Sequence, residues 1–145
     1  LTVVESAMAH APDELALADT IGVATPADVA ERVGAVRARF PEVPIRLHLH
    51  NTRNTGIANG WTGILAGAVS LDSSLGGVGG CPFAPRATGN IATEDLVYML
   101  DRAGISTGVD LDACIDAAEW LEAQLEHTLP GMVMKAGGFP APDAA

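Results

Sequence analysis

The chain has 145 residues, of which 8 are Lys or Arg and 18 are Asp or Glu, so its formal net charge is −10. This acidic balance argues against a protein that binds nucleic-acid phosphates, because such proteins carry clustered Lys and Arg. Apolar residues make up 48% of the chain, which is too high for a disordered protein, and no apolar run reaches the ~20 residues of a membrane-spanning helix. We therefore expect a compact α/β domain that binds neither nucleic acid nor membrane.

Two features bear on the origin of the chain. Its two cysteines, Cys81 and Cys114, are too few for a disulfide framework, which favours a reducing, cytoplasmic location. The first residue is Leu1 rather than Met, and the apolar residues at positions 3, 4, 7 and 8 fit the last turns of an amphipathic helix. We therefore expect the chain to be part of a longer protein.

Apolar runs and turn residues alternate along the chain. In order, they predict a strand at 14–20, a helix at 26–39, a strand at 45–51, a helix at 55–68, a strand at 70–74, and helices at 93–103 and 111–126. Thr25 and Pro26 supply the start signal of the first long helix. The segment 75–89 holds five glycines and two prolines, so we expect no regular structure there.

Strands that alternate with helices about 30 residues apart predict βα units and a parallel sheet. Three such strands make a poor domain on their own, which again indicates part of a larger fold. We divide the chain into a partial α/β unit, residues 1–128, and a loose carboxyl-terminal tail rich in Gly, Pro and Ala, residues 129–145.

Several side chains that can carry chemistry follow the predicted strands. His48 and His50 are two residues apart on a strand, so they share one face and could bind a divalent metal. Asp19 and Asp72 stand at the ends of the neighbouring strands. Active sites of parallel α/β folds form at this edge. The alternative is ordinary: polar strand residues for the histidines, and a turn or capping residue for Asp19.

Cys81 lies among four glycines and a proline, where little apolar surface could hide it, so a reactive thiol is plausible. Cys114 lies inside an amphipathic helix and is expected in the core. Arg53 and Arg86 are cations in acidic loops and are candidates for contacting an anionic substrate. Asn90 could simply cap the helix that follows it.

The segment GGVGGCPFAPRATGNIATEDLVYML, residues 76–100, closely resembles the signature of 3-hydroxy-3-methylglutaryl-CoA lyases. Asp19-Thr20-Ile21-Gly22 resembles the motif of strand six in that family, and His48-Leu49-His50-Asn51 resembles its metal-binding strand seven. The resemblance covers residues 13–112. It implies an α/β chain that forms the carboxyl-terminal part, about strands 6–8 with their helices, of a TIM (β/α)8 barrel.

The resemblance also implies functional roles. His48, His50 and Asn90 would hold a divalent metal, Mg²⁺ or Mn²⁺, and Cys81, His48 and Asp19 would be catalytic. Arg53, Arg86 and Asn51 are the predicted substrate contacts. The substrate would be an acyl-CoA cleaved to acetyl-CoA and a keto acid, as in leucine degradation, by a homo-oligomer or by a chain completed by a second one.

This chain departs from the family pattern in two ways. Asn51-Thr52 replaces an Asp-Thr pair, and the extra cation Arg53 could signal a different acyl group. The Arg-Asp pair of the family's first strand has no counterpart here, so the chain alone is expected to be inactive. Two alternatives stay open: a related metal-dependent aldolase or condensing enzyme, of the 4-hydroxy-2-oxovalerate aldolase or isopropylmalate synthase type, and a non-catalytic fragment that completes a barrel.

Overall fold

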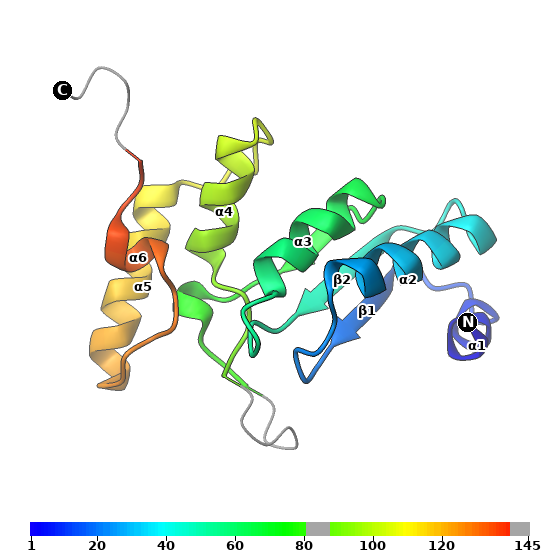
Figure 1. The fold of residues 1–145 in the computed structure, drawn as a ribbon, viewed down its shortest axis with the longest axis horizontal. Coiled ribbons are helices and arrows are strands. Elements are labelled where there is room, and N and C mark those ends of the chain that lie inside the picture. Colours follow the sequence, from blue (N-terminus) through cyan, green and yellow to red (C-terminus); the bar gives the residue numbers. More distant parts are fainter. Residues whose placement is uncertain (81–87, 140–145) are drawn as a thin grey trace.

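The computed structural model describes residues 1–80 and 88–139 of the chain. Strands and helices alternate as predicted through the first half of the chain (Figure 1). In order the elements are α1 (Thr2–Met8), β1 (Leu15–Asp19), α2 (Pro26–Arg39), β2 (Ile45–Leu49), α3 (Gly56–Leu65), β3 (Ser70–Asp72), the 3₁₀ turn η1 (Leu75–Gly77), α4 (Thr93–Arg102), α5 (Leu111–Leu125) and α6 (Val133–Ala136). Each strand is two residues shorter than predicted. Strands β2 and β3 end two residues early, where polar residues turn into the loops, and β1 loses one residue at each end.

The three strands form one parallel sheet in the order β1-β2-β3. Leu47 in the central strand pairs with Leu17 on one side and Leu71 on the other, and His48 pairs with Ala18 and Asp72. The parallel sheet expected from the βα spacing is thereby confirmed. The ends of all three strands meet at one edge, where the predicted site residues stand.

Helix α2 begins where its sequence signal lies. The Thr25 side chain accepts the backbone N–H of Asp28, and the Asp28 carboxylate accepts the backbone N–H of Thr25 at 2.8 Å. This reciprocal capping box satisfies two donors that the first turn leaves unpaired, and Pro26 occupies the first helical position. The start of α2 therefore follows from local chemistry alone.

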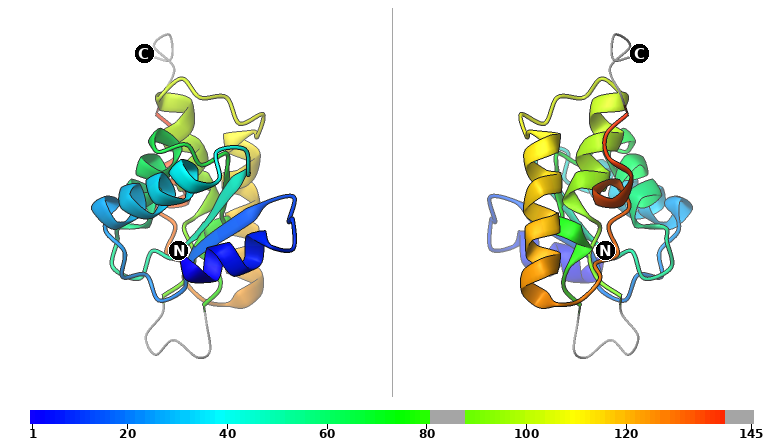
Figure 2. Two further views of the ribbon diagram at one scale, coloured as in Figure 1. Left: turned by 90° about the vertical axis from the view of Figure 1, so that its right-hand side faces the viewer. Right: turned by 90° about the vertical axis from the view of Figure 1, so that its left-hand side faces the viewer.

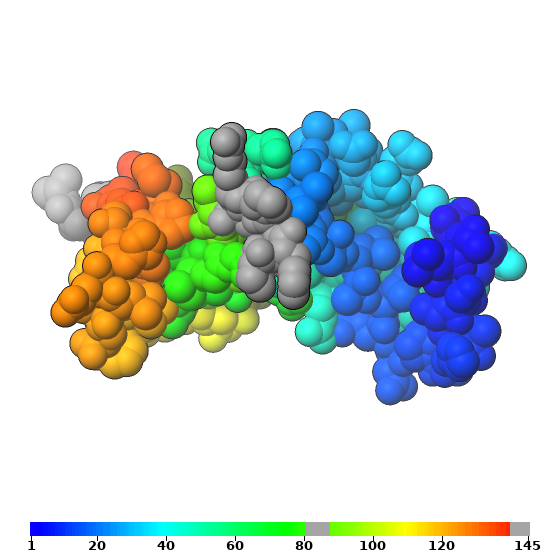
Figure 3. All heavy atoms as spheres, turned by 90° about the horizontal axis from the view of Figure 1, so that it is seen from below, coloured from blue at the N-terminus to red at the C-terminus, as the bar shows by residue number. Residues whose placement is uncertain are grey.

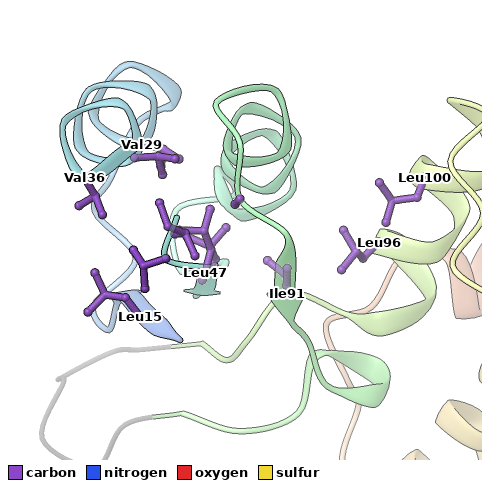
Figure 4. Packing of buried hydrophobic residues seen from close by; sticks show 12 residues of the cluster. Leu15, Val29, Val36, Leu47, Ile91, Leu96 and Leu100 are labelled. Atoms are coloured by element: carbon purple, nitrogen blue, oxygen red, sulfur yellow. The ribbon is translucent and has the colours of Figure 1, made fainter. Parts of the chain in front are cut away.

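The main core lies between the sheet and the helices that cover one of its faces. Leu47 of β2 points toward Val29 of α2, while Ile91 faces Leu96 and Leu100 of α4 (Figure 4). Burial alternates along β2, with Ile45, Leu47 and Leu49 almost wholly buried. The other face of the sheet carries Arg46 and His48, so the helices cover one side and the polar site forms on the other.

A second cluster joins α5, η1 and α6. Leu129 and Met134 pack with Ala118 of α5, and both are almost wholly buried. Helices α5 and α6 lie side by side (Figure 2, right). A loose tail is predicted from residue 129, but the apolar side chains of Leu129 and Met134 anchor the first part of this segment, residues 129–136. Residues 140–145 lie outside the described part of the chain.

The segment 75–89 also holds more regular structure than expected, since residues 75–77 form a 3₁₀ turn. The backbone N–H of Gly77 donates to Ser74 O at 3.0 Å, and that of Val78 donates to Leu75 O at 3.1 Å. Gly76 has φ +61°, a conformation that glycine adopts without steric cost. The glycines that argued against regular structure here permit this tight turn.

The molecule is elongated, with its amino-terminal residues at one end and α5 and α6 toward the other (Figure 3). No helix in residues 1–80 or 88–139 is both long and apolar enough to cross a bilayer.

Candidate active site

Two histidine rings meet at the end of β2, on the face that the helices leave uncovered. The Nε2 atoms of His48 and His50 lie 3.2 Å apart, and the two rings are nearly perpendicular, with centroids 5.2 Å apart. Leu47 and Leu49 point to the opposite face, into the core. The alternation of side chains along a strand thus brings the two rings together, as the His-x-His spacing predicts.

Asp72 stands beside His48 in the register of β2 and β3. Its Oδ2 lies 3.3 Å from Nδ1 of His48, and its Oδ1 lies 3.5 Å from Nη1 of Arg46. A carboxylate at Nδ1 favours a proton on that nitrogen and leaves the lone pair on Nε2, the atom that faces His50. Asp72 therefore orients the His48 ring.

Arg46 and Glu14 extend this network and were not singled out in the sequence. Glu14 forms an ion pair with Arg46, and its Oε1 accepts the hydroxyl of Ser70 at 3.3 Å. The hydrogen bond that Arg46 donates to the Glu14 carboxylate raises the pKa of Arg46, so the guanidinium remains charged. Residues 46 and 48 are two apart on β2 and therefore share a face, so the position of Arg46 beside His48 could have been predicted from the sequence. Its pairing with Glu14 depends on the sheet.

His50 is only 4% exposed. Burial is the main cause that lowers its pKa below the ordinary value of 6.5, and the nearby His48 lowers it further. Its imidazole is therefore neutral at physiological pH, which is the form that binds metals. The buried Nδ1 of His50 has no hydrogen-bond partner among the described residues.

Asn90 is brought to the histidines by tertiary structure. It forms an isolated antiparallel bridge with His50, flanked by hydrogen bonds from Asn51 N to Gly89 O at 3.0 Å and from Ile91 N to Leu49 O at 3.2 Å. Its Nδ2 donates to Val78 O at 3.1 Å. Its buried Oδ1 has no partner within the described ranges, so an acceptor is left unsatisfied on the residue that is bridged to His50.

These donors fit a divalent cation, since two imidazole nitrogens and an amide oxygen with an unused lone pair are suitable ligands. The fit is partial. In residues 1–80 and 88–139, no three His, Cys, Asp or Glu side chains converge on one point. A complete site needs at least one more ligand than His48, His50 and Asn90 supply.

Asp19 stands at the end of β1 but uses both carboxylate oxygens locally. Oδ1 accepts Val23 N at 3.0 Å and Oδ2 accepts Ala24 N at 2.9 Å. It therefore organises the loop after β1, which agrees with the alternative prediction that Asp19 is a turn residue. The carboxylate remains close enough to His50 to raise the pKa of that imidazole, although burial outweighs this effect. A catalytic role stays a prediction.

The predicted substrate contacts also have local roles. Oδ1 of Asn51 accepts Gly56 N at 3.0 Å, near the start of α3. Arg53, in the loop after β2, donates from Nη1 to Ile21 O at 3.0 Å and to Gly22 O at 2.9 Å, in the loop after β1. Substrate binding by either residue stays a prediction.

Two predicted site residues, Cys81 and Arg86, lie outside the described residues. Cys114 is buried, as expected for a core residue, and burial raises the pKa of its thiol. The structure therefore unites His48, His50 and Asn90 and places Asp19 at the adjacent strand end.

A parallel βα unit with polar groups at the carboxyl ends of its strands is typical of α/β enzymes, whether barrels or open sheets. The profile of the HMGL-like family matches residues 1–121, and the chain belongs to this family. An HMG-CoA lyase from Acinetobacter baumannii, solved in complex with coenzyme A and 3-methylmalate, superposes with a TM-score of 0.89 at 43% identity over 97% of this chain and 48% of that one. The fold is thus part of a TIM barrel, as expected.

Curated relatives agree on the class of enzyme. The (R)-citramalyl-CoA lyase of Chloroflexus aurantiacus is 52% identical over 132 residues, covering 88% of this chain and 42% of that protein. The hydroxymethylglutaryl-CoA lyase YngG of Bacillus subtilis is 49% identical over 117 residues, covering 81% and 39%. The chain therefore spans about two-fifths of the length of these acyl-CoA lyases.

Proposed function

We propose that the protein to which this chain belongs is a metal-dependent carbon–carbon lyase. Its substrate is an acyl-CoA like 3-hydroxy-3-methylglutaryl-CoA, which it cleaves to acetyl-CoA and a keto acid, acetoacetate for that substrate. The observation that carries the proposal is the meeting of His48, His50 and Asn90 at the strand ends, with the buried Asn90 Oδ1 left unpaired. The similarity to acyl-CoA lyases supports it.

The reaction is a proton transfer followed by bond cleavage. Loss of the proton from the tertiary hydroxyl group lets a carbonyl form at that carbon, and the electrons of the broken C–C bond pass to the thioester as an enolate. A proton delivered to the enolate carbon then gives acetyl-CoA. A bound Mg²⁺ or Mn²⁺ supplies Lewis-acid polarisation of the hydroxyl and carboxylate oxygens of the substrate.

The residues of this chain divide these tasks. His48 and Asp19 are the candidates for removing the hydroxyl proton, since both stand at the strand ends. Asp72 holds the His48 ring by its Nδ1, at 3.3 Å. Cys81 is proposed to deliver the proton to the enolate, and Arg53, Arg86 and Asn51 to contact the anionic substrate.

The acyl group is tested with a pair of substrates. HMG-CoA and citramalyl-CoA share a tertiary hydroxyl group, a methyl group and a thioester, and differ by one methylene next to the carboxylate. One methylene changes discrimination by about 10–200-fold. Acetyl-CoA release by the complete protein, measured with both compounds, therefore identifies the substrate. Cleavage of neither would overturn the lyase proposal in favour of an aldolase or condensing enzyme, which a panel of aldehydes and keto acids would then identify.

Substitution tests the roles. We expect His48→Ala or Cys81→Ser in the complete enzyme to lower kcat about a hundredfold or more, since positioned proton-transfer groups contribute about that much. His10→Ala, at an exposed histidine of the same chain, is the control and should retain full turnover. Wild-type turnover in both site variants would contradict the assigned roles.

Metal binding has a test that does not depend on turnover. Mn²⁺ titration of the complete enzyme, followed by electron paramagnetic resonance, should show binding that weakens in the His50→Ala and Asn90→Ala variants. Dialysis against a chelator should abolish acetyl-CoA release, and Mn²⁺ should restore it. Undiminished Mn²⁺ binding in both variants would show that the ion binds elsewhere.

The proposal also requires further strands that complete the barrel. Strand β1 pairs only with β2 among the described residues, so one of its edges carries unpaired backbone groups. The matching relatives are more than twice as long as the matched segment. Strand β3 is the other outer strand of the sheet. We propose that strands from the rest of the protein, or from a second chain, close the barrel along β1 and β3, and that the enzyme is a homo-oligomer.

A further inference from the structure

The loop between β1 and α2, residues 20–25, is tied to the carboxylate of Asp19. Both oxygens of that side chain accept backbone N–H groups of the loop, from Val23 at 3.0 Å and from Ala24 at 2.9 Å. Two hydrogen bonds to a charged acceptor fix the plane of the carboxylate relative to the loop. A shift of the backbone at Ala24 therefore moves the N–H group that holds the Asp19 carboxylate.

The carbonyl of the same residue, Ala24, is held by side chains near the start of α3 and within it. Its carbonyl accepts Nδ2 of Asn59 at 2.8 Å and Oγ1 of Thr55 at 3.1 Å. Asn59 is completely buried, and its Oδ1 has no partner within the described ranges. Burying an amide with half of its hydrogen-bonding capacity unused costs stability, so Asn59 is a poor choice for packing alone.

Arg53 holds the first half of the loop. Its Nη1 donates to the carbonyls of Ile21 and Gly22, and it stands in the loop that follows β2. Gly22 has φ +60°, and a Cβ built there would lie 2.8 Å from the Cβ of Thr52. The two loops therefore touch, and Arg53 and Asn59 clamp the loop of residues 20–25 at both of its ends.

We propose that Asn59 is a positioning residue that acts on the Asp19 carboxylate through the backbone of Ala24, with Arg53 as the second point of the clamp. The carbonyl of Ala24 accepts from Asn59 and its N–H donates to Asp19, so the backbone of this one residue links α3 to the strand end. This inference rests on the proposed function, because it assigns the loop geometry to an acyl-CoA lyase that uses Asp19. It makes Arg53 a determinant of loop shape in addition to its predicted substrate contact.

Hydrogen exchange of the complete enzyme tests the clamp without reference to activity. The peptide that spans residues 19–25 should exchange its amide hydrogens faster in Asn59→Ala and in Arg53→Met than in the wild type, because Val23 and Ala24 lose a fixed acceptor geometry. Thr62→Ala is the control, because Thr62 lies on the same helix and its side chain makes no hydrogen bond to residues 20–25. Arg53 is exposed, so its variant tests the clamp even if Asn59→Ala folds poorly.

Kinetics test the link to Asp19. We expect Asn59→Ala to lower kcat about tenfold to a hundredfold, with a much smaller change in KM, because misplaced catalytic groups cost about that much. Arg53→Lys, which keeps a donor, should recover part of the rate lost in Arg53→Met. In an Asp19→Asn background, Asn59→Ala should cause little further loss of kcat, since the two residues act in series.

Three results decide the matter. Unchanged exchange in residues 19–25 for both variants would overturn the clamp. Losses of kcat that simply multiply in the Asp19→Asn background would overturn the action through Asp19. An inactive wild-type enzyme would overturn the proposed function instead, and hydrogen exchange would then still decide whether Asn59 and Arg53 order the loop.

Discussion

At the scale of single residues, Glu94 shows how far burial can change a side chain that looks ordinary in sequence. Its place in the first turn of α4 suggests a surface carboxylate that favours the helix dipole. The structure buries it completely, with Oε2 accepting Gly76 N at 3.0 Å and Oε1 lacking a partner among the described residues. Burial, aided by Asp95, raises its pKa above the ordinary value of 4.5 even though Lys135 opposes the shift.

The raised pKa of Glu94 predicts a pH-dependent stability. An acid with a raised pKa in the folded state binds its proton more tightly there than in the unfolded state, so its ionisation destabilises the fold. The stability of the wild type relative to Glu94→Gln should therefore be highest below pH 4.5 and should fall as pH rises through the folded-state pKa. Urea unfolding of the complete enzyme across this range measures the difference.

The exposed Glu119 on α5 provides the matched substitution, Glu119→Gln, as a control for the charge change itself. A wild-type minus Glu94→Gln difference that stays constant between pH 4 and pH 8 would contradict the prediction. The slope of this stability difference against pH also gives the difference between the folded and unfolded states in the number of protons bound at this carboxyl group.

At the scale of elements, two helical glycines have opposite surroundings. Gly34 of α2 has open space around the position of a Cβ, with no atom within 4 Å. Gly63 of α3 faces the sheet, and a Cβ there would overlap Cδ1 of Leu47, which is almost wholly buried in β2. The small face of α3 therefore permits the close approach of helix and strand, whereas Gly34 has no such role.

Alanine substitution separates the two cases. Gly34→Ala should raise the free energy of unfolding by about 0.5–1 kcal/mol, since alanine favours the helix over glycine by about that amount. Gly63→Ala should lower it by about 1–3 kcal/mol, because overpacking displaces Leu47. Denaturant unfolding of both variants measures the changes. Equal effects of the two substitutions would show that helix propensity, not packing against β2, decides the result.

At the scale of the whole molecule, the surface along β1 is unlike the rest of the sheet. Burial in β1 is incomplete, and Ile21 and Val23 beyond its end are each about half exposed. A cavity of about 550 Å³ lies along this side, between β1 and α2, and Leu17 lines it. An apolar, unpaired edge of this kind is a surface that another strand covers.

The unpaired edge predicts the behaviour of the 145-residue chain alone. We expect it to self-associate as its concentration rises and to lack lyase activity, and we expect Leu17→Lys to reduce the association by placing a charge on the edge. Ala123→Lys, at an exposed position of α5, is the control. Multi-angle light scattering measures the mass. A stable monomer at all concentrations would contradict an edge that needs covering.

Much of this organisation follows from local sequence. Period-two alternation places His48 and His50 on one face, the Thr25 capping box starts α2, and the apolar runs locate all three strands, because each signal involves residues within one or two turns of chain. The family signature at residues 76–100 adds the identity of the barrel. These features need no knowledge of how distant segments pack.

Contacts between distant segments were decided only by tertiary structure. Asn90 meets His50 through a bridge across 40 residues of sequence, Asp72 meets His48 through the register of β2 and β3, and Asn59 holds Ala24 from another helix. Glu94 and Leu129 are buried because α4, α5 and the segment after α5 pack together. Periodicity determines which face of an element a side chain occupies, whereas its partner depends on packing and strand register, which local pattern does not encode.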